Sequence, residues 1–362
     1  MILYLIPYVA CTLCALAYQL KIIRLGPAAY GMALFLLGLV AGIRFEAGQD
    51  WDAYEDYFDE VVVPGFDLVK SRYEPAYYIL NYLVKTLGGT YPIVQLIASM
   101  FCAFAVYRLT SRMTLNRFYV LAVYMGYSYL VLHFAQVRQS LALGFFLLGL
   151  DHYFRHGTKL PAMMIALIGP FFQLSALLYF IVLAPVIIWQ SGNVWWWLAA
   201  AIAAVIAVVA AQFIDLVSLI SMVSSSNTQD KLAIYSVLKT EQGPFQIIYA
   251  CYLLLLCLYF VRFSRGLTPD KVFIIRYAVC SLAVTVMCTF LLAGSYVFYS
   301  RAYSVACLFQ GFAAAIVFAS RKGALHSLVF YISLAVASVS YCRIIDFYED
   351  QYTPYQIFFW QY

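Results

Sequence analysis

The sequence predicts an all-α, polytopic integral membrane protein with about twelve transmembrane helices. Hydrophobic residues make up 65% of the 362 positions, and charged residues make up only 11%. A soluble domain of this size needs more polar groups than that to cover its surface. The apolar residues also recur in runs of about 17 or more, which is long enough to cross a hydrocarbon core of about 30 Å. Few of these runs alternate as the strands of a membrane barrel do.

The expected spans follow the apolar runs along the chain. Met1–Leu20 has no basic residues at its start, so we interpret it as a retained first span rather than a cleavable signal peptide. The runs lie at 2–20, 26–43, 91–107, 118–134, 139–154, 160–172, 174–189, 195–221, 244–261, 272–293, 302–319 and 325–342.

Basic clusters predict which ends of the spans are cytoplasmic, because short cytoplasmic loops are rich in Lys and Arg. Placing all the clusters on one side makes 74–107 cross once, so 74–87 is expected to be re-entrant or to lie in the interface. The run 160–189 must then cross twice, with a break near Gly169–Pro170. Both termini are expected outside. The clusters are Lys21/Arg24, Arg108/Arg112/Arg117, Arg155/Lys159, Arg262/Arg265/Lys271 and Arg321/Lys322.

The chain is expected to form a single polytopic membrane domain over 1–362, with a one-sided cavity on the outer, extracytoplasmic face. Nine of the 17 acidic residues fall between Glu46 and Glu74, within and just after the outer loop 44–73. A second outer loop at 222–243 could act as a lid or be a plain connector. The net charge of +5 is explained by the cytoplasmic clusters, so nucleic acid is not expected as a partner.

Three arginines lie at the outer ends of spans: Arg44, Arg138 and Arg301. A charged side chain at membrane depth costs about 2.5–3.5 kcal/mol, so an arginine there usually faces a cavity and an anion. A planar, permanently charged guanidinium suits phosphate or diphosphate. Arg138 is the main candidate, and its neighbours Gln136 and Gln139 are candidates for substrate binding. The alternative for Arg138 is a snorkelling interfacial arginine.

Carboxylates of the acidic loop could act as a general base toward an acceptor hydroxyl, and Asp50 and Glu74 are the candidates. Asp50 could instead pair with Arg138. A divalent ion is an alternative, but the run from Asp50 through Asp52 to Asp56 lacks the glycine and the final glutamate of an EF-hand loop. We therefore expect no metal site. A solvated loop is the further alternative, and it suits the later acidic residues.

Other polar and aromatic residues on the outer side are candidates for sugar binding. Gln173 and Ser175 lie at the expected tip of the 160–189 hairpin, where they could hydrogen-bond a sugar or merely cap a helix. Tyr54, Tyr73 and Tyr303 are among 32 tyrosines, whose rings stack on sugar faces while their hydroxyls pair with sugar hydroxyls. An interfacial aromatic belt is the alternative for any single tyrosine.

Six short motifs follow one another along the chain. They are Arg44-x3-Gly48-x-Asp50-x3-Tyr54-x3-Phe58, Glu74-Pro75, Arg138-Gln139-x-Leu141-Ala142, Phe172-Gln173-x-Ser175-Ala176, Arg301-x-Tyr303 and Tyr352-x-Pro354-Tyr355. In this order they resemble the EpsG-like branch of the Wzy polysaccharide polymerases, bacterial membrane proteins that extend exopolysaccharide or O-antigen chains. Gln173 departs from the pattern, because the family commonly has histidine there and a glutamine cannot shuttle a proton.

The resemblance implies a glycosyltransferase that joins oligosaccharide repeat units carried on undecaprenyl diphosphate, at the outer face of the bacterial cytoplasmic membrane. It implies that Arg138 and Arg301 stabilise the departing diphosphate in place of a metal, with Arg44 in support and Asp50 or Glu74 as base. Lipid-linked sugars are already activated, so no cofactor is expected. A separate protein is expected to regulate chain length.

Two rival functions need similar residues. A flippase for lipid-linked oligosaccharides also uses cationic cavities and broken helices. Its charges should line a full transmembrane path, however, whereas the inner halves of these spans are nearly free of charge. An O-antigen ligase or another lipid-linked glycosyltransferase differs in its acceptor, which the sequence does not identify.

Overall fold

The computed structural model describes residues 2–48, 50–61, 72–113, 116–190, 244–291, 296–347 and 356–357. These residues are helical apart from connecting turns and one pair of two-residue strands, so the all-α prediction is confirmed for them. The chain divides into two compact units, the first containing Met1–Leu177 and Ala314–Tyr362 and the second containing Leu178–Ala313. The predicted span 195–221 and outer loop 222–243 lie outside the described residues.

Apart from α3 and α4, the helices of the first unit follow the predicted apolar runs. Short π-helical and 3₁₀ stretches interrupt them after α6 and after α8. The α-helices are α1 (Ile2–Gln19), α2 (Pro27–Gly42), α3 (Trp51–Glu60), α4 (Pro75–Thr86), α5 (Tyr91–Met113), α6 (Arg117–Tyr124), α7 (Val137–His156), α8 (Lys159–Leu167) and α16 (Ala324–Phe347). The interrupting stretches are η1 (Met125–Tyr129), η2 (Val131–Ala135), η3 (Gly169–Phe171) and η4 (Leu174–Ala176).

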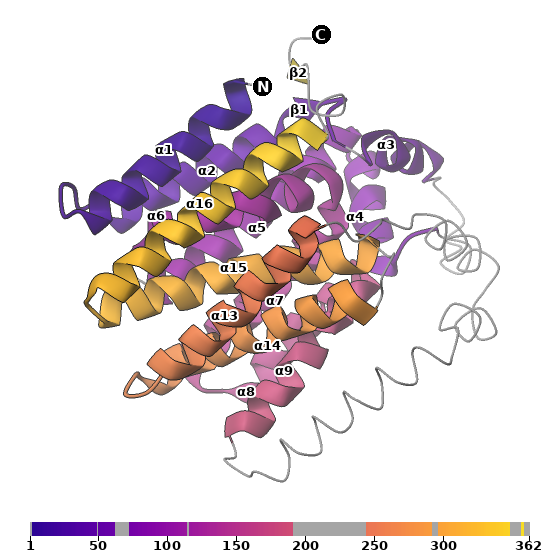
Figure 1. The fold of residues 1–362 in the computed structure, drawn as a ribbon. Helices are drawn as coiled ribbons and strands as arrows, with labels where there is room; N and C mark the ends of the chain where they lie inside the picture. The colour runs from indigo at the N-terminus through magenta and orange to yellow at the C-terminus, as the bar shows by residue number, and fades with distance from the viewer. Residues whose placement is uncertain are drawn as a thin grey trace. The chain divides into compact units, whose positions relative to one another are not determined.

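Contacts between helices that are far apart in the sequence hold the first unit together. Small residues allow close approach, as is common where lipid supplies no hydrophobic drive between helices. A Cβ at Gly42 of α2 would lie 2.9 Å from the Cα of Leu96 on α5. Elsewhere α1 and α16 run side by side (Figure 1). Tyr8 stacks on Tyr341 with ring centroids 4.3 Å apart, and the Tyr341 hydroxyl donates to the Tyr4 carbonyl at 2.7 Å.

A strand pair brings the tail of the chain to the end of α2. β1 (Arg44–Phe45) pairs antiparallel with β2 (Gln356–Ile357), and Arg44 lies opposite Ile357. The start of the first motif therefore meets Gln356 and Ile357 through backbone pairing. The Tyr352-x-Pro354-Tyr355 motif itself lies outside the described residues.

Two predicted departures from uninterrupted spans are present. α4 has 12 residues, so it is about 18 Å long and too short to cross a bilayer. α8 ends at Leu167 and α9 begins at Leu177, which puts a break at the predicted Gly169–Pro170. A third interruption was not predicted, because the run 118–134 changes from α-helix to largely π-helix after Tyr124.

Three helical segments in the described part of the chain are long and apolar enough to cross a membrane: Tyr91–Met113, Arg301–Ser320 and Ala324–Asp346. They support a helical membrane protein. About twelve crossings, their orientation, the outer cavity and a single membrane domain stay predictions. Shorter apolar helices are Tyr4–Gln19, Pro27–Gly42, Lys159–Phe171, Leu174–Ile187 and Ile248–Phe263.

The second unit contains the chain between the two parts of the first. Hydrogen bonds join its helices in pairs. The Tyr277 hydroxyl on α14 donates to the Tyr179 carbonyl on α9 at 3.1 Å, and Gln310 Nε2 on α15 donates to the Tyr252 hydroxyl on α13 at 3.2 Å. The helices are α9 (Leu177–Gln190), α13 (Pro244–Phe263), α14 (Pro269–Leu291) and α15 (Tyr296–Ser320), whose last turns belong to the first unit.

Candidate functional site

Arg138 lies in the first turn of α7, immediately after a break in the helical backbone at Gln136. Gln136 has φ −106° and ψ 57°, which ends the π-helical stretch η2 and lets α7 begin at Val137. π-Helical stretches are rare and occur frequently at functional sites. The Arg138 side chain is only 13% exposed, so neighbouring groups must stabilise its permanent charge.

A carboxylate and three tyrosines stabilise that charge. Arg138 forms an ion pair with Glu74, and its Nε donates to the Tyr54 hydroxyl at 3.5 Å. Its guanidinium lies over the Tyr73 ring, 4.0 Å from the centroid, and 6.0 Å from the centroid of Tyr77. Such cation–π contacts are favourable where the cation is partly desolvated. We call Tyr54, Tyr73, Glu74, Tyr77 and Arg138 the Arg138 cluster.

Glu74 links three segments of the first unit. It precedes α4, where Pro75 fits the first helical position, yet the Glu74 side chain does not cap that helix. One carboxylate oxygen binds Arg138, and the other accepts the backbone N–H of Leu174 at 3.0 Å. Leu174 opens η4 in the predicted break. The Glu74-Pro75 motif therefore ties α4 both to the start of α7 and to the break.

Tyrosine rings form one side of the Arg138 cluster. The Tyr73 centroid lies 4.5 Å from that of Tyr57, 5.6 Å from that of Tyr54 and 5.7 Å from that of Tyr77. Burial raises the pKa of Tyr54 to about 12, although the positive charge of Arg138 opposes this shift. Tyr54 therefore keeps its proton at neutral pH and remains a hydrogen-bond donor.

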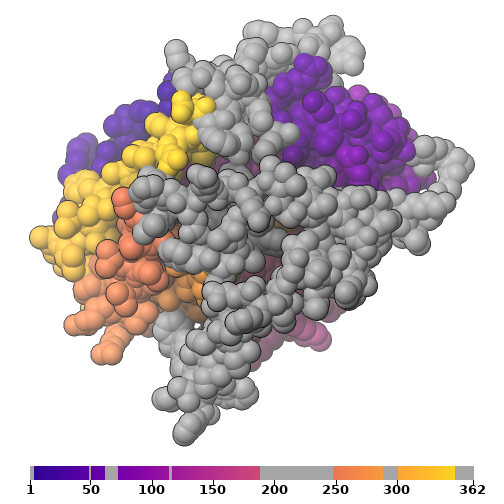
Figure 2. All heavy atoms as spheres, turned by 45° about the vertical axis from the view of Figure 1, so that its right-hand side comes forward, coloured from indigo at the N-terminus to yellow at the C-terminus, as the bar shows by residue number. Residues whose placement is uncertain are grey.

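The predicted acidic loop 44–73 contains the helix α3. Apolar residues recur in it at helical spacing, and Trp51, Tyr54 and Phe58 are buried on one face. Asp59 and Glu60 are exposed, which fits the solvated alternative for the later acidic residues. Figure 2 shows α3 and α4, in purple, at the surface of the molecule.

Arg44 is fully buried, and its guanidinium donates to three backbone carbonyls. The acceptors are Ala41 at 2.5 Å, Ala47 at 2.7 Å and Phe134 at 3.1 Å. These bonds fasten the end of α2 to η2, just before Arg138. The geometry favours structural support by Arg44, and its predicted contact with substrate stays a prediction.

The segment from Gly48 to Asp50 fits tightly against η2. Gly48 has φ +115°, and a Cβ there would lie 2.0 Å from the Phe134 carbonyl oxygen, so only glycine suits this position. Asp50 is half-buried at the start of α3. Its negative charge contributes to the raised pKa of Tyr54, behind burial. Asp50 thus lies within electrostatic reach of the Arg138 cluster.

Polar residues of the break contact the start of α7. The Ser175 hydroxyl donates to Gln139 Oε1 at 3.2 Å, and Gln139 is buried. Gln173 is also buried, and its side chain makes no capping hydrogen bond, so the helix-cap interpretation does not apply to it. Gln136 is half-buried two residues before Arg138. The substrate-binding roles of these four residues stay predictions.

Arg301 and Tyr303 lie on α15 in the second unit, whereas the other candidate residues belong to the first unit. Arg301 is half-buried. Tyr303 is buried and packs edge-to-face on Tyr249, with ring centroids 5.5 Å apart. That Arg301 and Arg138 share one diphosphate site stays a prediction.

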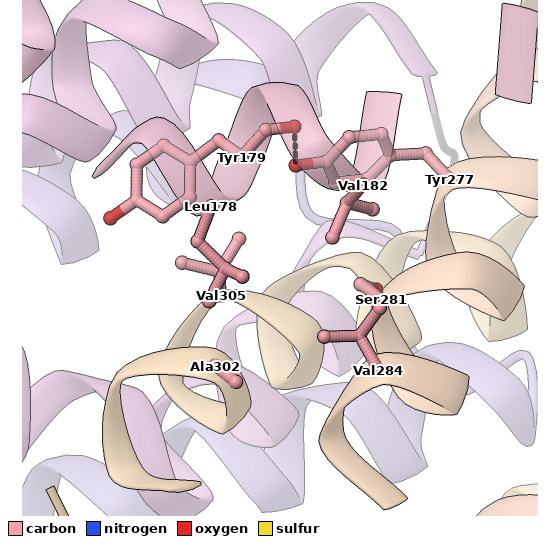
Figure 3. A pocket seen from close by; sticks show the side chains of 8 residues that line it. All are labelled: Leu178, Tyr179, Val182, Tyr277, Ser281, Val284, Ala302 and Val305. Atoms are coloured by element: carbon pink, nitrogen blue, oxygen red, sulfur yellow. Dashed lines mark hydrogen bonds between the residues drawn. The ribbon is translucent and has the colours of Figure 1, made fainter. Parts of the chain in front are cut away.

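A small pocket lies within the second unit, and its lining is almost entirely apolar (Figure 3). None of the predicted site residues lines it, although Ala302 stands between Arg301 and Tyr303 in the sequence. It offers no charge for a diphosphate. The lining residues are Leu178, Tyr179, Val182, Tyr277, Ser281, Val284, Ala302 and Val305. Over the described ranges, no group of three or more His, Cys, Asp or Glu residues could hold a metal ion.

Sequence reasoning missed two contributors to the site. Tyr77 follows Glu74 by three residues, so the helical spacing after Glu74-Pro75 could have indicated it. The Leu174 N–H is the second, and no pattern of side chains indicates a backbone donor.

Comparison with known families places nearly all of the chain within one of them. The EpsG family matches residues 28–357. All six motifs, from Arg44 to Tyr355, fall inside that range. No match was found among curated proteins, and none among solved structures.

Proposed function

This chain belongs to the EpsG family, which is associated with exopolysaccharide biosynthesis, and from that membership we propose that it is a polysaccharide polymerase. It joins oligosaccharide repeat units carried on undecaprenyl diphosphate into O-antigen or exopolysaccharide chains. The reaction takes place at the outer face of the bacterial cytoplasmic membrane. The substrate lipid stays in the bilayer, and a separate protein regulates chain length.

The reaction transfers the growing chain to the non-reducing sugar of an incoming unit. The bond between the anomeric carbon and the lipid diphosphate breaks, and the diphosphate leaves with the bonding electron pair. A new bond forms between that carbon and a hydroxyl oxygen of the acceptor, whose proton passes to a carboxylate. The largest charge that develops is therefore on the leaving diphosphate, where fixed positive groups stabilise it most.

The largely enclosed side chain of Arg138 is the observation that carries the chemistry of the proposal. The side chain is 13% exposed, and its guanidinium is held by a carboxylate and a tyrosine ring, so its position is fixed before substrate binds. A preorganised cation in a site of low dielectric constant needs no reorganisation as charge develops. Arg301 is the second diphosphate-binding arginine of the proposal.

The tyrosines and amides around Arg138 suit the sugar. Tyr73 is half-buried and offers a ring face for stacking and a hydroxyl for pairing, whereas the buried Tyr54 offers its hydroxyl. Gln139 and Ser175, which already hydrogen-bond each other, and Gln173 offer further donors and acceptors. Asp50 and Glu74 are the two carboxylates near Arg138 that can accept the acceptor's proton.

The test is turnover by the purified full-length protein with lipid-diphosphate-linked repeat units in the presence of EDTA. The wild type should yield a ladder of longer glycans, and Arg138→Ala should not. Arg24→Ala, an exposed arginine of the first basic cluster, is the matched control and should polymerise normally.

The outcomes separate the rival functions. Absence of a ladder together with transbilayer movement of labelled lipid in liposomes would replace the polymerase with a flippase. Transfer of a single chain to a different lipid acceptor, without a ladder, would indicate a ligase. A ladder that EDTA abolishes would overturn the metal-independent chemistry.

A further inference from the structure

The Glu74 carboxylate occupies two donors that come from separate segments. Arg138 supplies a charged N–H at the start of α7, and Leu174 supplies a backbone N–H in the break between α8 and α9. Arginine N–H groups and backbone N–H groups are the donors by which proteins bind phosphate oxygens. A carboxylate and a phosphate present similar charged oxygens to such donors. The pair of donors is therefore an anion site that the protein's own carboxylate fills.

The exposure of this pair indicates an exchangeable carboxylate. Glu74 is more exposed than the cation that it binds, 21% against 13%. Leu174 is 62% exposed, and its hydrogen bond to Glu74 lies in an exposed position. The Glu74 side chain makes no capping bond to α4, and α4 does not depend on its position. An incoming anion can thus reach both donors without unfolding a helix.

We propose that Glu74 is a placeholder in a diphosphate site formed by Arg138 and the Leu174 N–H, and that substrate diphosphate displaces it. This rests on the proposed polymerase function. The displaced carboxylate loses its ion pair and becomes free to accept a proton. It takes the proton of the acceptor hydroxyl as the new glycosidic bond forms, while the diphosphate leaves onto Arg138 and the Leu174 N–H. Diphosphate binding and base release are therefore one event.

Pyrophosphate binding tests the placeholder without any polymerisation. Full-length protein in nanodiscs is titrated calorimetrically with inorganic pyrophosphate in EDTA. Glu74→Gln keeps the size of the side chain and removes the competing charge, so it should bind pyrophosphate about tenfold or more tightly than the wild type. Arg138→Ala should lose binding. Equal or weaker binding by a folded Glu74→Gln protein would overturn the proposal.

Two substitutions at Leu174 isolate the backbone donor. Leu174→Pro removes the N–H together with the leucine side chain, and Gln173 already has the extended backbone, φ −153° and ψ 112°, that a following proline prefers. Leu174→Ala loses the same side chain and keeps the N–H. Pyrophosphate should bind about tenfold more weakly to Leu174→Pro than to Leu174→Ala. Equal binding by the two variants would remove Leu174 from the site.

The same titration identifies the source of the anion. Glucuronate offers a sugar carboxylate and no phosphate. A stronger response of Glu74→Gln to glucuronate than to pyrophosphate would assign the donors to an acidic sugar and overturn the diphosphate assignment.

The proposed function and the placeholder fail separately. One outcome is that the variants rank as expected in pyrophosphate affinity but the wild type yields no glycan ladder. That outcome would support the diphosphate site and overturn the polymerase function together with its proton transfer. A ladder from Glu74→Gln at the wild-type rate would remove Glu74 as the base. Tighter pyrophosphate binding together with slower polymerisation in Glu74→Gln is the result that supports the whole proposal.

Discussion

An arginine–carboxylate ion pair lies near each end of α7, and the two pairs differ in which group is the more buried. Near the start, Arg138 is 13% exposed and its partner Glu74 is 21% exposed. Near the end, Asp151 is 2% exposed, and its partners Arg108 and Arg155 are 35% and 39% exposed. In the first pair the cation is the more buried group, whereas in the second it is the anion.

This difference separates a binding site from a structural contact. Both oxygens of Asp151 accept hydrogen bonds from guanidinium groups at 2.9–3.1 Å; the Arg108 pair joins α5 to α7, and the Arg155 pair lies within α7. Arg108 and Arg155 keep access to water, so their charges need no additional anion. Arg138 instead lies against the Tyr73 ring and pairs with Glu74, the carboxylate that we propose to be displaced. A largely enclosed cation with such a partner is suited to bind an anion from outside.

The largest expected effect is on Arg138. Arg138→Ala removes the fixed cation and should lower the rate of glycan extension by about 10²- to 10³-fold, as for loss of a main transition-state donor. The rate is measured from the glycan ladder under single-turnover conditions, with Arg24→Ala beside it. A loss below about threefold would show that Arg138, like the Asp151 pair, is not needed for turnover.

The next effect concerns the segment that supports the Arg138 end. Gly48→Ala forces a Cβ against the Phe134 carbonyl oxygen and a residue at φ +115°, so we expect about 2–3 kcal/mol of destabilisation. Thermal unfolding in detergent at a fixed scan rate measures it. Gly88→Ala is the control, because Gly88 also has a positive φ, +78°, but has open space around it. Equal shifts in Tm would show that the clash with Phe134 adds nothing to the cost of placing alanine at a positive φ.

A smaller effect is expected at the other end of α7. Asp151→Asn weakens the bonds to two half-exposed arginines, so stability should fall by about 1–2 kcal/mol. Turnover per folded molecule should stay unchanged, because this pair is structural. Tm and ladder rate, measured on one preparation, test both halves. A large loss of turnover at normal Tm would contradict the structural assignment.

The smallest effect is expected at Tyr73. Tyr73→Leu removes the ring that lies 4.0 Å from the Arg138 guanidinium, which should cost about 1 kcal/mol and weaken pyrophosphate binding about fivefold. Tyr73→Phe keeps the ring and should bind within about twofold of the wild type. Calorimetric titration of both variants measures the difference. Equal binding by Leu and Phe variants would remove the cation–π contact from the site.

Much of the Arg138 end could be predicted from residue types. A lone arginine at the start of an apolar run, and a glutamate before a proline after an acidic segment, both stand out in the sequence. The structure brings Arg138, Glu74 and Tyr54 together, and it joins Ser175 to Gln139. The expected break near Gly169–Pro170 and the short segment after Glu74 also follow from charge and length, and both are present.

Other features depend on tertiary contacts that no local pattern encodes. The sequence suggested Asp50 as a partner for Arg138, and the structure places Glu74 there. Arg44 resembles Arg138 in its sequence context, but it binds backbone carbonyls that only the folded loop and η2 supply. The π-helical change after Tyr124 and the Leu174 N–H leave no residue signature. In α3 the many acidic residues mask the helical spacing of Trp51, Tyr54 and Phe58.

The pairing of β1 with β2 has a consequence for biogenesis. β1 follows the second apolar helix and emerges early in translation, whereas its partner emerges only after α16. The Arg44 segment can form this ladder only after the last apolar helix has been synthesised. A nascent or truncated chain that lacks β2 leaves the backbone of Arg44 and Phe45 without these hydrogen bonds. The ladder therefore depends on synthesis of the chain through Ile357.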